Sequence, residues 1–147
     1  MEAFWHNSAI WIPFIVWTVV QLLKFFFDFL KYKKINFRRI WGSGGMPSSH
    51  SALVCSLATI VALKEGVDST IFAMSLVLAS VVMYDAAGIR RAAGKQARVL
   101  NQIIEGDEEI NIPEKLTELL GHTPKEVIVG AVIGIFLSIF LERVIFV

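Results

Sequence analysis

Two of the three histidines in this sequence lie where a loop of unusual composition runs into an apolar stretch. The first junction is Gly42-Ser-Gly-Gly-Met-Pro-Ser-Ser-His-Ser-Ala52, in which glycines free the backbone and Pro47 suits a first helical turn. Ser48, Ser49 and His50 then supply donors where a new helix has unpaired N–H groups. Such a helix start is a natural site for an anion, especially phosphate. A glycine-rich turn with a serine cap explains the same residues without any function.

The second junction is Gly121-His-Thr-Pro-Lys-Glu-Val-Ile-Val-Gly130. Thr123 as N-cap, Pro124 as first helical residue and Glu126 at the third position form the pattern of a capping box, which needs no function to explain it. His122 is not part of that pattern. Because Glu126 follows four residues later, its carboxylate can hold the imidazole, fix its tautomer and raise its basicity. His122 is therefore a candidate nucleophile or general base.

A third cluster, Tyr84-Asp-Ala-Ala-Gly-Ile-Arg-Arg-Ala-Ala-Gly-Lys-Gln96, follows another apolar stretch. Arginines in this place are ordinary anchors at a membrane surface. Asp85 needs a partner at the edge of a span, and Arg90 or Arg91 can supply it. The cluster is thus either an anchor or part of a charged site.

Lys24 raises the same question inside the first apolar stretch. With Gln21 and Asp28 it recurs at helical spacing on one face. Lys24 and Asp28 can snorkel to the nearby interface, but a polar stripe of three residues favours the interior of a helix bundle.

The elements that must position these residues are apolar blocks. Of the 147 residues 55% are hydrophobic and 18% charged, and the apolar residues lie in blocks rather than alternating with polar ones. This excludes a disordered chain and favours a membrane protein. The net charge of +1 gives no overall attraction to nucleic acid. The single cysteine, Cys55, excludes an intramolecular disulfide framework and a cysteine-based zinc site.

Four blocks approach the roughly 20 helical residues that a bilayer requires, at residues 9–30, 48–63, 70–87 and 126–146. The second is short unless its polar first turn belongs to the helix. In the polar stretch Gly88 to Lys125 we expect one or two amphipathic helices, at 91–104 and 113–120, the second capped by Asn111 and ended by Gly121. The predicted fold is therefore all-α: a single domain over residues 1–147, built as a polytopic membrane bundle of about four transmembrane helices.

Basic residues predict the orientation. They follow the first and third blocks, which places both loops on the cytoplasmic side, in a multi-pass protein of the plasma membrane. These residues are Lys31, Lys33, Lys34, Arg38 and Arg39 after the first block, and Arg90, Arg91, Lys95 and Arg98 after the third. In the fourth block, Gly130 and Gly134 form a small-xxx-small pair that lets a helix approach closely, which could also join two copies of the chain.

Taken together, these residues resemble the type 2 phosphatidic acid phosphatase superfamily, which includes bacterial acid phosphatases and vanadium-dependent haloperoxidases. Pro47-Ser-Ser-His50 is similar to its Pro-Ser-Gly-His motif, with Ser49 in place of Gly. The stretch from His122 to Gly130 is similar to the end of its third motif, Ser-Arg-x5-His-x3-Asp, with Glu126 in place of Asp. The words GGMPSSHSA, VMYDAAGIRRAAGKQA and GHTPKEV, in this order, resemble the divergent branch of that superfamily, which consists of small integral membrane proteins.

The resemblance implies a mechanism. His122 would attack phosphorus to form a phosphohistidine while Glu126 orients its other ring nitrogen, and His50 would protonate the leaving alcohol oxygen. Cationic side chains would neutralise the equatorial oxygens, so that neither a metal nor another cofactor is implied. The candidate phosphate-binding residues are Lys24, Ser48, Ser49, Arg90 and Arg91, with Asp85 in support.

The departures from the superfamily fall at cationic positions. Leu116 stands where the superfamily has an arginine six residues before His122, and Lys115 stands in place of the preceding serine. Arg90, Arg91 or Arg98 would have to replace that arginine from elsewhere in the chain.

The first motif of the superfamily, Lys-x6-Arg-Pro, is also incomplete. Lys24 with Lys31, and Lys31 with Arg38, both keep the cationic spacing and both lack the proline. We favour Lys24, because a lysine inside an apolar block has more need of an anionic partner.

The leading functional prediction is a membrane phosphatase that acts on a phospholipid or isoprenoid phosphate, such as phosphatidic acid, phosphatidylglycerophosphate or a polyprenyl pyrophosphate. The alternative is a non-catalytic membrane protein that binds anionic lipid head groups or a protein partner through the same basic site. A haloperoxidase is the third reading, which nothing in the sequence favours.

Overall fold

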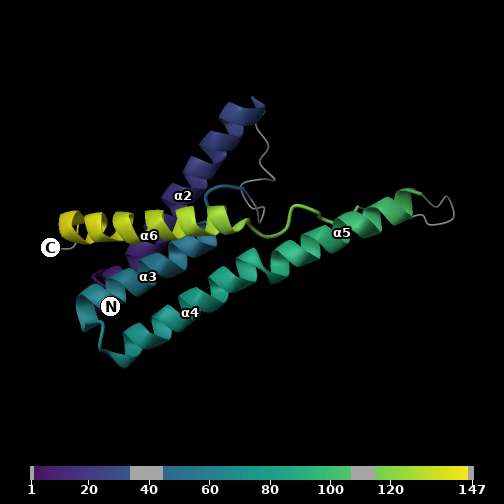
Figure 1. Ribbon diagram of the computed structural model, residues 1–147. Helices are drawn as coiled ribbons and strands as arrows, with labels where there is room; N and C mark the ends of the chain where they lie inside the picture. Colours follow the sequence, from purple (N-terminus) through teal and green to yellow (C-terminus); the bar gives the residue numbers. More distant parts are fainter. Residues whose placement is uncertain (1, 34–44, 107–114, 146–147) are drawn as a thin grey trace.

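The computed structural model describes residues 2–33, 45–106 and 115–145, and the regular elements within these ranges are all helices. In chain order they are α1 (Glu2–Trp5), α2 (Ser8–Tyr32), α3 (Ser49–Glu65), α4 (Thr70–Ala87), α5 (Ile89–Glu105) and α6 (Pro124–Ile145) (Figure 1). The prediction of an all-α membrane bundle is confirmed, and each of the four apolar blocks forms one helix.

By length and composition, three stretches of the described chain are able to cross a membrane: Ser8–Leu30, Thr70–Glu105 and Pro124–Ile145. The second expected span, α3, is not among them. Its 17 residues measure about 26 Å along the axis, against about 30 Å of hydrocarbon. α3 need not face lipid to be stable, because it packs against α2, α4 and α6 (Figure 1).

Two apolar clusters fix α3 in the centre of the bundle. One cluster joins it to α2 and α6, and its buried members are Ile12, Val16, Val20, Ala52, Ile60 and Leu141. The other joins it to α4 through Val54, Cys55 and Ala79. Outward faces of the surrounding helices carry exposed large apolar side chains, among them Phe26, Val77 and Phe136. Such faces suit contact with lipid chains.

Two glycines of α6 bring its backbone into close contact with that of α3. A Cβ on Gly130 would collide with the carbonyl oxygen of Ser48, and one on Gly134 would lie 2.5 Å from that of Ala52. One turn further along α6, Ser138 donates a hydrogen bond of 2.6 Å to Ser56. The expected close approach at the small-xxx-small pair thus occurs within the chain. The face that the sequence suggested for joining two copies is occupied by α3.

α5 confirms the amphipathic helix expected at 91–104. It begins directly after Gly88 at the end of α4 and extends the direction of α4 beyond the rest of the bundle (Figure 1). Its buried positions are Gly94, Ala97 and Asn101.

The second amphipathic helix, expected at 113–120, was wrong for the residues that the structure describes. Residues 115–120 contain no helix. The reason is tertiary, since the side chain of Asn101 takes both backbone hydrogen bonds of Leu116. Gly121 therefore ends no helix. Asn111 and the start of this expected helix lie outside the described residues.

Pro47 was also misplaced by the sequence analysis. It precedes the N-cap residue Ser48 instead of opening the first turn of α3, and the Met46–Pro47 peptide bond is cis. The capping role of Ser48 is confirmed, because its hydroxyl accepts a hydrogen bond from the N–H of Ser51.

The α3–α6 contact can be tested by adding one methyl group. Gly130→Ala should force the two helices apart and lower the stability by about 1–3 kcal/mol, the usual effect of overpacking. The measurement is the thermal unfolding midpoint of the full chain in detergent. Ile128→Ala is the matched control, because Ile128 is 61% exposed on the same helix. An unchanged midpoint for Gly130→Ala would show that the contact is not tight.

Candidate active site

Two backbone hydrogen bonds bring three chain junctions together at one end of the bundle. The N–H of Ser48, before α3, donates to the carbonyl of Glu126 in α6 at 3.1 Å. The N–H of His122, before α6, donates to the carbonyl of Ala86 in the last turn of α4 at 2.9 Å. The predicted serine–histidine and histidine–glutamate junctions thus lie side by side, next to the end of α4.

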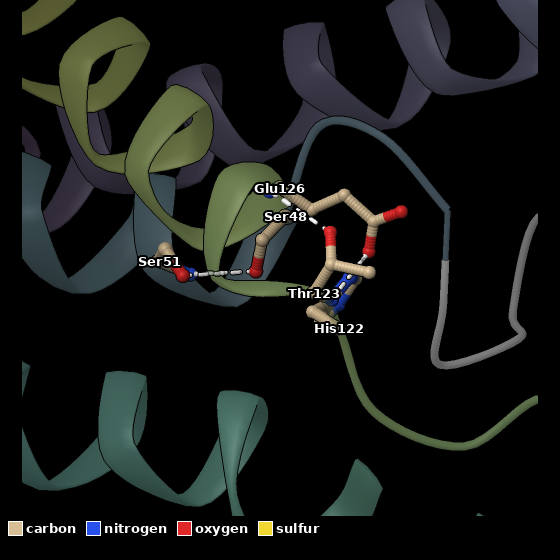
Figure 2. Close-up of polar contacts among 5 residues, drawn as sticks. All are labelled: Ser48, Ser51, His122, Thr123 and Glu126. Carbon is tan, nitrogen blue, oxygen red and sulfur yellow. Dashed lines mark hydrogen bonds and ion pairs between the residues drawn. The ribbon is translucent and has the colours of Figure 1, made fainter.

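The expected capping box is present at the start of α6 (Figure 2). The N–H of Thr123 donates to Oε2 of Glu126 at 2.9 Å, and the N–H of Glu126 donates to the hydroxyl of Thr123 at 3.4 Å. The same Oε2 lies 3.3 Å from Nδ1 of His122. One carboxylate therefore caps the helix and holds the imidazole at once.

His122 is almost completely enclosed, with 3% of its surface exposed. Burial lowers the pKa of His122 below its ordinary value of 6.5, and the charge of Lys24 acts in the same direction. The hydrogen bond and charge of Glu126 oppose this shift, as does a hydrogen bond with the backbone of Gly45. The net effect keeps the imidazole neutral near pH 7, which is the form that can attack phosphorus.

Serines of the first junction line the start of α3. Besides capping Ser51 N–H, the Ser48 hydroxyl accepts a hydrogen bond of 2.9 Å from the Ser51 hydroxyl (Figure 2). Ser48, Ser49 and Ser51 are all buried. The serine-cap explanation is therefore correct, and it places the first N–H groups of α3 beside the α6 junction.

His50, in the first turn of α3, is exposed at the surface of the described chain. Four titratable groups lie close enough to act on it electrostatically: Arg90, His122, Lys24 and Asp85. Arg90 pairs with Asp85 at 2.5 Å across the junction of α4 and α5. Of the two candidate partners for Asp85, Arg90 is thus the one that the structure selects.

Arg91 contributes to the site through its main chain. Gly121 has a φ of +77°, which glycine adopts freely, and a Cβ there would collide with the backbone of Arg90 and Arg91. This close approach seats the His122 loop on the start of α5. This contact was not predicted from the sequence, although a glycine directly before the candidate nucleophile was a usable signal.

Lys24 lies inside the bundle, as its place in the polar stripe predicted, with 5% of its surface exposed. Its charge acts on both His50 and His122, so it belongs to the same cluster. Its Cε lies 3.2 Å from the point where Gly45 would carry a Cβ. The competing assignment of Lys31 and Arg38 falls on side chains outside the described residues.

Within the described chain, no three His, Cys, Asp or Glu side chains form a group that could hold a metal ion.

Comparisons with known proteins identify the family of this chain. Residues 5–137 match the profile of the Divergent PAP2 family. The chain is 41% identical to an uncharacterised membrane protein, YuiD, of Bacillus subtilis (strain 168), in a match that covers 82% of this chain and 85% of the relative. No solved structure matches the chain. Because the family profile covers most of the chain, including the whole of α2, α3, α4 and α5 and more than half of α6, the chain belongs to the Divergent PAP2 family of membrane proteins.

Proposed function

We propose that this protein is an integral membrane phosphatase that hydrolyses a phosphate monoester or pyrophosphate of a lipid through a phosphohistidine. The observation that carries the proposal is the enclosed imidazole of His122, which is held by Glu126 and lies within electrostatic reach of Lys24 and His50. Arg90 in turn lies within electrostatic reach of His50. Family membership supports a relationship to phosphatases but names no substrate.

In the first step, a ring nitrogen of His122 attacks phosphorus and the bond to the leaving oxygen breaks. The electron pair stays on that oxygen, which takes a proton from His50. Glu126 stabilises the positive imidazole that results. In the second step, water attacks phosphorus and gives its proton to His50, the N–P bond breaks, and phosphate leaves with His122 restored.

Cationic groups around the two histidines would neutralise the transferring phosphoryl group. Lys24 acts on both histidines, and Arg90 acts on His50 while Asp85 fixes its position. Ser49 would offer its N–H group at the start of α3. The N–H of Ser48 is already bound to the carbonyl of Glu126, so Ser48 would contribute its hydroxyl. Arg91 completes the proposed phosphate site only if its side chain turns inward from the start of α5.

The surroundings of the site support a lipid as the substrate. Tyr84 and Ile89, on either side of the Asp85–Arg90 pair, are 74% and 63% exposed. An acyl or isoprenoid chain can lie against such side chains while the phosphate enters the polar site. We therefore favour phosphatidic acid, phosphatidylglycerophosphate or a polyprenyl pyrophosphate, approached from the cytoplasmic leaflet of the plasma membrane.

One observation favours a second candidate function. Leu116, at the position of the superfamily arginine, is 40% exposed, and its backbone is bonded to Asn101. A chain that lacks this cation could bind an anionic head group or a protein partner at the same site without hydrolysis.

His122→Ala separates the two candidates. We expect it to slow phosphate release from these lipids by about 10³-fold or more, because it removes the proposed nucleophile. The measurement is phosphate release by the full chain in detergent with each of the three lipids. His6→Ala is the control, since His6 is exposed in the turn before α2.

The contrary outcome is equally specific. If the wild-type chain releases no phosphate, or releases it as fast as His122→Ala, the phosphatase proposal is wrong. Binding of anionic lipid that survives His122→Ala and weakens with Arg90→Ala and added salt would then establish the non-catalytic function.

Glu126→Gln tests the tuning of His122. Only the neutral imidazole attacks, so kcat/KM should fall as the pH drops through the His122 pKa, which lies below 6.5. Because Glu126 raises that pKa, the variant should move this acidic limb to lower pH while kcat falls by about 10²-fold or more. Glutamine still completes a capping box, so α6 should keep its start.

The control for this profile is Glu65→Gln, an exposed carboxylate at the far end of α3. Its acidic limb should match that of the wild type. A limb that moves to higher pH in Glu126→Gln would contradict the assigned role of Glu126.

A further inference from the structure

Residues 115–121, which we call the strap, lead to His122 and lie along α5. At the far end of the strap, Asn101 pairs with the backbone of Leu116 like a second peptide group. Its Nδ2 donates to the Leu116 carbonyl at 2.9 Å, and the Leu116 N–H donates to its Oδ1 at 3.0 Å. Asn101 is 5% exposed, so this pair is shielded from water.

Glu118 adds a second attachment in the same region. Its carboxylate accepts hydrogen bonds from Nδ2 of Asn101 at 2.9 Å and from Nε of Arg98 at 3.2 Å. The hydrogen bond from Asn101, followed by that from Arg98, lowers the pKa of Glu118. The carboxylate is therefore ionised near neutral pH and bound to α5 by two donors.

Gly94, a residue of α5, lies against the middle of the strap. A Cβ at this position would lie 2.5 Å from the carbonyl oxygen of Glu118 and 3.0 Å from that of Leu120. Since both atoms belong to the backbone, neither can move aside as a flexible side chain would. The strap can lie this close to α5 only because residue 94 lacks a side chain.

The close contacts between the strap and the helices extend as far as His122. Gly121 rests on the backbone of Arg90 and Arg91, and the N–H of His122 reaches the carbonyl of Ala86. From Leu116 to His122, an extended chain covers roughly 20 Å, and the helical stretch from Asn101 back to Ala86 covers about 22 Å. The two lengths match, so an extended strap can run along this stretch from one attachment to the other.

We propose that Asn101 and Gly94 are positioning residues, which set the place of His122 in the site by fixing the register of the strap on α5. Their effect on catalysis rests on the proposed phosphatase function, but their effect on the location of His122 does not. They touch neither substrate nor reacting atoms. In this proposal α5 is the element that fixes the position of the loop carrying His122.

The test uses Asn101→Ala, which removes the attachment, and Gly94→Ala, which pushes the strap away. Alanine favours helix more than glycine does, so Gly94→Ala cannot act by unfolding α5. The matched controls are Gln102→Ala, an exposed neighbour, and Gly106→Ala, where a Cβ would meet atoms only at 3.5 Å and beyond.

The first measurement is the titration of His122 by NMR of histidine-labelled full chain, with His122→Ala to assign the signal. The groups that face His122 are Glu126 from α6, Lys24 from α2 and His50 from α3, together with the Gly45 backbone, and all are unchanged in these variants. Burial is the main cause of the lowered pKa of His122, so both variants should raise it toward 6.5. Both controls should leave it unchanged.

The second measurement is phosphate release. Both variants should lower kcat by roughly tenfold or more with little change in KM, since a displacement of about 1 Å suffices for such losses. The double variant should be no worse than the more damaging single one, because both act on the same strap. Asn101→Gln, which keeps the amide, should recover part of kcat.

Outcomes of the two measurements are separable. An unchanged His122 titration in both variants overturns the proposal, whatever the enzyme activity. A shifted titration in a chain whose wild type releases no phosphate supports the positioning role and rejects the phosphatase function. If Asn101→Ala does not fold, Gly94→Ala and Asn101→Gln decide the matter by the same titration.

Discussion

The backbone contact between α3 and α6 determines where the site can form. Gly130 lets the first turn of α6 meet Ser48, and the Ser48 N–H bonds to the carbonyl of Glu126. His50 follows Ser48 by two residues, and His122 precedes Glu126 by four. The distance between the two histidines is therefore set by main-chain atoms and by the lack of a side chain at residue 130. Such a backbone contact has less conformational freedom than a contact between long side chains.

A consequence is that the polar groups gather at one end of an otherwise apolar bundle. Helix ends supply N–H groups there, and the carboxylate of Glu126 serves both as a cap and as the partner of His122. Lys24 is buried within α2 and belongs to this end of the bundle, where its charge acts on both histidines. Deeper in the bundle, the Ser56–Ser138 hydrogen bond keeps its polar atoms satisfied between helices.

Much of this arrangement could be predicted from the sequence. The exceptions share one cause, which is that they depend on contacts between residues far apart in the chain. The four apolar blocks and the capping box follow from local composition, so they were predictable. The helix expected at 113–120 failed over its described part because Asn101, distant in sequence, takes the backbone bonds of Leu116. Arg90 and Arg91 could not be separated, since they are adjacent in sequence and only the packing of Gly121 and Asp85 distinguishes them.

The enclosure of α3 also bears on how the protein enters the membrane. Residues 51–62 are buried or half-buried between other helices, and several of them are serine or threonine. Such a helix is poorly suited to reside alone in lipid, where its hydroxyl groups would face hydrocarbon. Only four residues, Gly66 to Ser69, connect it to the more apolar α4. During biosynthesis α3 is therefore best inserted together with α4, as the two arms of one helical hairpin.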